Sequence, residues 1–151
     1  MDKLAVLSKS ELFGKLDDKQ LEEVGKMCTL EVFEPGALIA KQDHKEDKVY
    51  VIEEGLVGII LESGPLSQRQ VQAASNYDVV GWSAMIEPYI ATATVRAIEK
   101  TKALAFDGMY LHNLCLSRPE IGCRVSRGLA RVVATRLRNA YAQLLGITSQ
   151  V

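Results

Sequence analysis

The chain has 151 residues, of which 48% are hydrophobic and 25% charged, and its formal net charge at neutral pH is −1. These values are typical of one globular domain and give no support for a nucleic-acid or membrane partner. The N-terminal apolar stretch is too short for a signal peptide, and no apolar run is long enough to span a bilayer. The three cysteines include no Cys-x-x-Cys pair, so we expect a cytoplasmic protein with reduced thiols.

The first segment, residues 1–29, has the pattern of helices. Asp17 can cap a helix, and Gln20 three residues later completes a capping box. Leu21 and Val24 then recur at helical spacing. We therefore expect N-terminal helices ahead of the next segment.

From residue 30 to residue 107 the pattern changes to short runs typical of strands. Turn signals such as Pro35-Gly36 and Ser63-Gly64-Pro65 separate the runs. The expected strands cover residues 30–33, 37–40, 48–53, 56–61, 70–74, 78–80, 92–98 and 103–106. Short strands at this regular spacing predict an all-β sandwich or barrel.

The last segment, residues 108–151, is predicted to be helical. Asp107 can cap one helix, and Pro119 suits the first position of another. That last helix carries an apolar stripe wide enough to pack both on its own barrel and on a second copy. The stripe consists of Ile121, Val125, Leu129, Val133 and Leu137, widened by Val132 and Leu145.

The arginines between positions 118 and 138 are interpreted as a solvated face, with a patch for nucleic acid or an acidic partner as the alternative.

Three blocks, at residues 33–39, 49–57 and 81–97, occur in an order that resembles a known family. They resemble the cyclic nucleotide-binding domain of catabolite-activator and FNR-type regulators, over roughly residues 8–145. The resemblance implies a mainly β fold with flanking helices: a jelly-roll (double-stranded β-helix) barrel, N-terminal helices and a long C-terminal helix. We accordingly expect a single domain over residues 1–151.

The third block resembles the family's phosphate-binding cassette but lacks two charged side chains. In the family, a glutamate after the cassette glycine accepts the ribose 2′-hydroxyl, and an arginine pairs with the phosphate. Gly81 matches the glycine, and Trp82 occupies the glutamate position. The arginine position falls on Ala91, or on Ile90 if the loop is shifted by one residue, and neither is basic. Hydrogen bonds to charged groups contribute roughly 1.5–3 kcal/mol each, so losing two weakens binding by about 10²- to 10⁴-fold. Little binding of cyclic AMP or cyclic GMP is expected.

The expected ligand-binding residues are those of the cassette and the strand after it. They are Gly81, Trp82, Ser83, Ala84, Ala91, Thr92, Ala93 and Thr94. Trp82 has two interpretations: its side chain fills the cavity, or it lines a pocket for a less polar or aromatic ligand. Ser83, Thr92 and Thr94 could hydrogen-bond such a ligand, or they could be ordinary cap and strand residues.

The function expected is that of a non-enzymatic regulatory sensor that binds a non-standard small ligand or none. The alternatives are a scaffold or interaction protein with a filled pocket, and a genuine but weak cyclic nucleotide binder. No catalytic residue or resident cofactor is expected. No metal site is expected either, because His112, Cys115 and Cys123, if the helices bring them together, would still need a fourth ligand. A small-molecule effector and a protein partner are the candidate partners.

The resemblance also implies a homodimer that forms through the C-terminal helix. The expected interface consists of Val125, Leu129, Val132, Val133, Arg136 and Leu137. Because the chain ends at Val151, we expect a stand-alone domain with no helix-turn-helix domain and no direct DNA binding.

Overall fold

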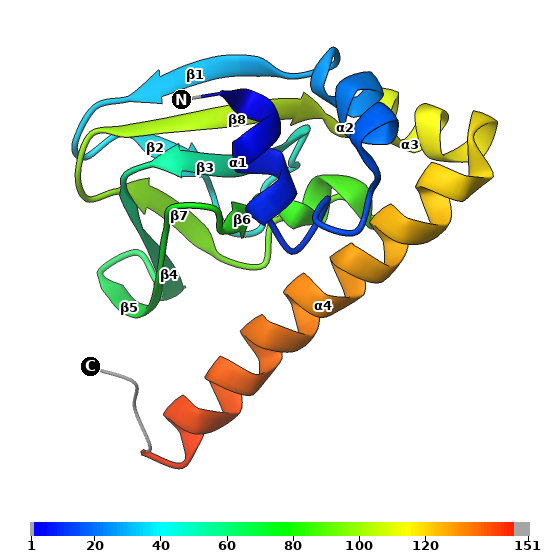
Figure 1. Cartoon of the computed structure of the whole chain (residues 1–151). Helices are drawn as coiled ribbons and strands as arrows, with labels where there is room; N and C mark the ends of the chain where they lie inside the picture. The colour runs from blue at the N-terminus through cyan, green and yellow to red at the C-terminus, as the bar shows by residue number, and fades with distance from the viewer. Residues whose placement is uncertain (1, 147–151) are drawn as a thin grey trace.

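A computed structural model describes residues 2–146 of the chain. The elements in chain order are α1 (Lys3–Lys9), α2 (Asp18–Gly25), β1 (Thr29–Phe33), β2 (Leu38–Ala40), β3 (Lys48–Glu54), β4 (Leu56–Gly64), β5 (Ser67–Ser75), β6 (Val79–Val80), the 3₁₀ helix η1 (Trp82–Met85), β7 (Thr94–Ala97), β8 (Thr101–Asp107), α3 (Gly108–Ser117) and α4 (Pro119–Leu144). Figure 1 shows the strands packed together, α1 in front of them, α2 and α3 at one end, and one long helix running alongside.

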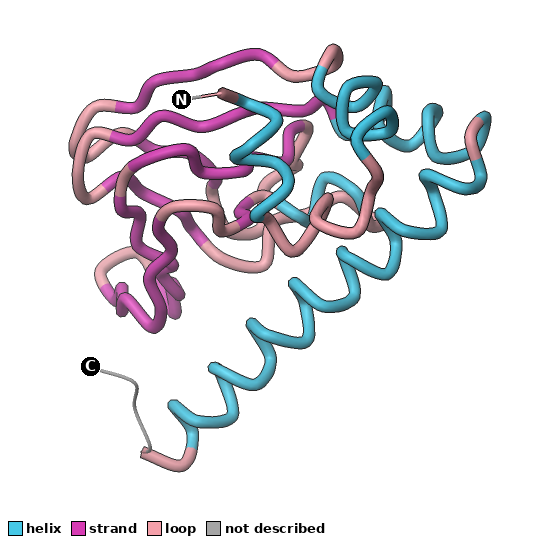
Figure 2. The backbone as a smooth tube through the Cα atoms, viewed as in Figure 1, coloured by secondary structure: helices cyan, strands magenta, loops and turns pink. Residues whose placement is uncertain are grey.

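The strands form two four-stranded sheets, with orders β1-β8-β3-β6 and β2-β7-β4-β5. All pairings within them are antiparallel. The prediction of a mainly β fold with flanking helices and a long C-terminal helix is confirmed (Figure 2). A closed barrel is not observed, because the strands divide between two sheets.

The helix ends follow the local signals in the sequence. The Asp17 carboxylate accepts the Gln20 N–H at 2.9 Å, and the Gln20 side-chain oxygen accepts the Asp17 N–H at 3.0 Å. This capping box begins α2, as predicted. Asp107 caps α3, and Pro119 is the first residue of α4, so both of those predictions are confirmed.

The β4–β5 hairpin is longer than the sequence predicts. β4 continues to Gly64 and β5 begins at Ser67, although residues 67–69 are polar and give no alternating apolar signal. Pairing with β4 supplies their order, because Arg69 lies opposite Leu61. Conversely, β7 is shorter than predicted, since Ala91 exchanges backbone hydrogen bonds with the loop at Asp43 and His44.

Two apolar clusters make up the core. One lies between the helices and the first sheet, where the rings of Phe13 and Phe106 are 4.9 Å apart. The other lies between the two sheets and includes Ile52 and Val57, both fully buried. No helix within residues 2–146 is long and apolar enough to cross a membrane.

The N-terminal half of α4 is fixed by this core. Val125 and Val132, expected at a dimer interface, are 0% and 3% exposed and pack inside the protomer. For these two residues the expectation is corrected, since no surface is left for a partner. An apolar stripe predicts that a helix face is buried, but not whether it packs inside the protomer or against a second copy. Leu129 is partly buried against the same cluster.

Candidate ligand-binding cavity

A cavity of about 730 Å³ lies between the second sheet, the cassette and α4. Its wall is mostly apolar, with side chains from several elements. The second sheet contributes Ala40, Ile59, Leu61, Ser63, Arg69, Val71, Gln72 and Val95, and β6 of the first sheet contributes Val80. The cassette region contributes Gly81, Trp82, Ser83, Ala91, Thr92 and Ala93. The remaining lining residues are Val133, Arg136, Leu137, Ala140, Gln143 and Leu144 of α4, and Glu46 of the loop before β3. The long helix therefore forms one side of the cavity.

Gly81 is required by the backbone at the start of the cassette. Its φ of +75° is a left-handed conformation, and an added Cβ would lie 2.6 Å from the Lys48 carbonyl oxygen. The 3₁₀ helix η1 begins directly after it, and Trp82 and Ser83 line the cavity. The Trp82 ring also packs partly against the helix-side core. The cavity stays open beside it, so this side chain lines the space without filling it.

Six of the eight predicted ligand-binding residues lie together on the cavity wall, and two do not. Ala84 is buried against α3, where its carbonyl oxygen would be 2.5 Å from a Cβ on Gly108. The Thr94 hydroxyl donates to the Glu62 carboxylate and accepts the Gln42 N–H at 3.0 Å. The prediction that Thr94 contacts a ligand is therefore replaced by a structural role.

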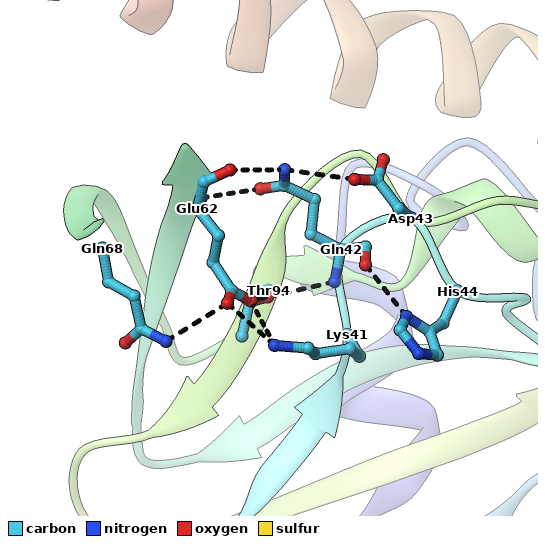
Figure 3. Close-up of polar contacts among 7 residues, drawn as sticks. All are labelled: Lys41, Gln42, Asp43, His44, Glu62, Gln68 and Thr94. Atoms are coloured by element: carbon cyan, nitrogen blue, oxygen red, sulfur yellow. Dashed lines mark hydrogen bonds and ion pairs between the residues drawn. The ribbon is translucent and has the colours of Figure 1, made fainter. Parts of the chain in front are cut away.

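That role belongs to a polar network that joins β4, β7 and the segment after β2 (Figure 3). Lys41 Nζ donates to both Glu62 carboxylate oxygens at 2.8 Å, and Gln68 Nε2 donates to Oε1 at 3.2 Å. The Gln42 side chain bonds the backbone N–H and carbonyl of Glu62 at 2.8 and 2.9 Å. The hydrogen bonds from Lys41 and Thr94 lower the pKa of Glu62 to about 2.

The network positions the cavity wall without lining it. Side chains alternate along a strand, so Leu61 and Ser63 face the cavity while Glu62 between them faces the network. In the same way Ala93 and Val95 line the cavity on either side of Thr94. No local signal predicts this cluster, because Glu62 and Thr94 are 32 residues apart.

Glu46 lies in the charged run of residues 43–47, yet its side chain is buried, with the residue only 7% exposed, and it lines the cavity. Burial, followed by the neighbouring charge of Asp47, raises its pKa to about 7. Its backbone N–H donates to the Tyr89 carbonyl at 2.8 Å, and Ala91 N–H donates to the His44 carbonyl at 2.9 Å. These bonds hold Glu46 beside the Ala91 end of the cavity.

Arg136 is the charged residue that α4 contributes. Its Nη2 donates to the Val79 carbonyl at 2.9 Å, and burial lowers its pKa although Asp78 and Glu11 favour its charge. Gln72 Nε2 also donates to the Arg136 carbonyl at 3.3 Å. Arg136, Val133 and Leu137 were all expected at a dimer interface, and all three line the cavity.

Comparison with known proteins identifies the family. Residues 30–118 match the model of the cyclic nucleotide-binding domain. The chain belongs to this family. No curated protein matches it.

Solved structures share the fold of this cyclic nucleotide-binding domain. A cyclic nucleotide-binding domain from Methylobacillus flagellatus KT has 18% identity and a TM-score of 0.83, covering 98% of this chain and 83% of that one. The N-terminal domain of a transcriptional regulator from Streptomyces coelicolor A3(2) has 27% identity and a TM-score of 0.70, covering 97% and 99%. The catabolite activator protein of Thermus thermophilus has 21% identity and a TM-score of 0.75, covering 89% and 62%.

The family assignment gives this cyclic nucleotide-binding domain the fold of a regulatory or sensor module. Such domains and regulators of the catabolite-activator type are generally non-enzymatic. Trp82 and Ala91, which the resemblance aligns with the family's two charged contacts, both line the cavity.

Proposed function

We propose that this domain is a non-enzymatic sensor whose cavity binds a small, largely apolar or aromatic molecule in place of a cyclic nucleotide. The observation that carries the proposal is the open cavity of about 730 Å³ beside Trp82. Small-molecule sites have volumes of roughly 300–1,000 Å³, apolar walls and a few polar groups. A scaffold with a filled pocket needs no such space.

Two features of the cavity disfavour a cyclic nucleotide. Ala91 offers no charge to a phosphate, and Trp82 offers an apolar ring where a ribose needs an acceptor. Glu46, held beside Ala91, adds an acidic group at the end where the phosphate would lie. A phosphate there would face an acidic group and no basic partner from the cassette, which disfavours its binding.

Calorimetry and a thermal-shift screen test this proposal. We expect no binding of cyclic AMP or cyclic GMP in the low micromolar range, and an increase in Tm with an acyl or aromatic metabolite. Ala91→Trp, which places a large side chain in the cavity, should abolish that increase. Low micromolar binding of a cyclic nucleotide would favour the weak-binder interpretation instead. A screen without any hit would favour the scaffold.

Ligand occupancy would be transmitted through α4. This helix supplies part of the cavity wall, and it presents an exposed apolar face on its C-terminal half. On that half Leu137, Tyr141, Leu144 and Leu145 are 48%, 58%, 83% and 74% exposed. A ligand that binds one position of α4 better than another shifts the population of that position, and with it this face.

The exposed half of α4 is our proposed homodimer interface. Tyr141→Glu and Leu145→Glu, which change side chains outside the cavity wall, should each convert the dimer to a monomer, because they bury a charge at an apolar contact. Sedimentation velocity measures the result. Leu66→Glu, at a fully exposed hairpin position, is the matched control and should stay dimeric. A monomeric wild type, or dimers of both α4 variants, would contradict the proposal.

A protein partner, the absence of direct DNA binding and a cytoplasmic location stay predictions.

A further inference from the structure

Two arginines line the cavity: Arg69 is exposed on β5, whereas Arg136 is partly buried and its guanidinium has unused binding capacity. It has five N–H donors, and its described hydrogen bond is the one from Nη2 to the Val79 carbonyl. The ion pairs formed within residues 2–146 involve Lys41, Lys48, Lys100 and Arg118, and none includes Arg136. A cation thus faces a mostly apolar cavity without a carboxylate within ion-pair distance.

We infer that the cavity binds an organic acid with an apolar body, and that its carboxylate pairs with Arg136. This inference rests on the proposed function and specifies the ligand class for the same cavity. A planar guanidinium binds a carboxylate through two parallel hydrogen bonds, which are among the stronger ones in proteins. The apolar body would lie against side chains such as Ile59, Val71 and Trp82.

The energetics favour an anion at this point. A charge taken out of water is costly unless it is paired, and burial already lowers the pKa of Arg136. Asp78 and Glu11 act on it only at longer range, because neither is within 4.0 Å. An incoming carboxylate would supply the missing partner inside a low-dielectric site, where charge-assisted hydrogen bonds are strengthened.

The rest of the cavity gives the ligand a direction. Glu46 lies at the end beside Ala91, held by backbone bonds to the segment 89–91, whereas Arg136 bonds the backbone of β6. A carboxylate would be repelled by an ionised Glu46 and attracted by Arg136. The acid group therefore points toward α4, away from the cassette position at which the family pattern expects the phosphate-binding arginine.

The test compares acids with their neutral analogues on the full chain. The probes are hexanoate, octanoate, decanoate, 3-phenylpropionate and indole-3-acetate, each paired with its primary amide and measured by calorimetry. At least one acid should bind roughly 10- to 100-fold more tightly than its amide, the range for hydrogen bonds to a charged group. Arg136→Met, which keeps an apolar stem, should remove this preference, and Arg136→Lys should keep part of it.

Arg138→Met is the matched control, because Arg138 is exposed on the same helix and does not line the cavity. This variant should keep the wild-type preference for the acid. The inference is overturned if amides bind as tightly as acids, or if Arg136→Met keeps the preference. It is also overturned if the metabolite screen gives hits while every acid fails. In each of these cases the proposed function still stands. If no acid, amide or metabolite binds at all, the proposed function fails and this inference fails with it.

Discussion

Gly128→Ala should lower the free energy of unfolding by about 3 kcal/mol, the upper end of the cost of overpacking a core. Alanine normally stabilises a helix interior by about 1 kcal/mol relative to glycine. At this position, however, a Cβ would lie 2.4 Å from the Leu12 carbonyl oxygen and 2.6 Å from that of Glu11. Both obstacles are backbone atoms that cannot rotate away, so α4 must separate from the segment before α2. Urea denaturation measures the loss.

The control for this variant is Gly64→Ala. An added Cβ on Gly64 meets nothing within 4 Å, and its φ is not in the left-handed region. Its stability should change by no more than about 0.5 kcal/mol, the usual range for surface substitutions. A Gly128→Ala protein as stable as the wild type would show that α4 does not dock as closely as described. The variant should also bind ligand more weakly, since residues 133–144 of α4 form the cavity wall.

Local signals in the sequence were enough to predict where the helices begin, because those starts have local causes. Asp17 with Gln20 and the Pro119 start each involve groups within a few residues, so spacing alone predicts them. These signals were enough to give the strand order along the chain. The position of the cassette came from the family resemblance, and the positive φ of Gly81 explains why a glycine stands there.

The polar side of the cavity could not be predicted in this way, because its causes lie far apart in the chain. Glu46 stands in a charged run that is typical of a solvated turn, and its burial depends on the segment around Tyr89. Arg136 lies 57 residues from the Val79 carbonyl that it bonds. Helical periodicity placed Arg136 on one face of α4, but whether that face meets a partner or the cavity depends on where the sheet lies.

Glu46→Gln should remove a pH dependence of stability between about pH 4.5 and pH 7. The ordinary pKa of this carboxyl is 4.5 and its folded pKa is about 7, so the unfolded chain releases the proton first as pH rises. The contribution of Glu46 to the free energy of unfolding is therefore fully present below pH 4.5 and is lost as pH rises through 7. The loss amounts to up to about 3 kcal/mol at 1.36 kcal/mol per pKa unit. Groups around Glu46 include Asp47 and Tyr50 as well as Arg69 and Arg136 across the cavity.

Denaturation of the wild type and Glu46→Gln from pH 2 to pH 8 measures this effect as a difference, in which the contributions of the shared groups cancel. The variant should match the wild type near pH 4 and exceed its stability near pH 8. Glu62→Gln is the matched control with the opposite sign. The folded pKa of Glu62 is lowered to about 2, so its contribution is present above pH 4.5 and lost as pH falls toward 2. Because the two windows do not overlap, parallel curves for the wild type and Glu46→Gln above pH 4.5 would mean that Glu46 is hydrated, and that the Ala91 end of the cavity is open to water.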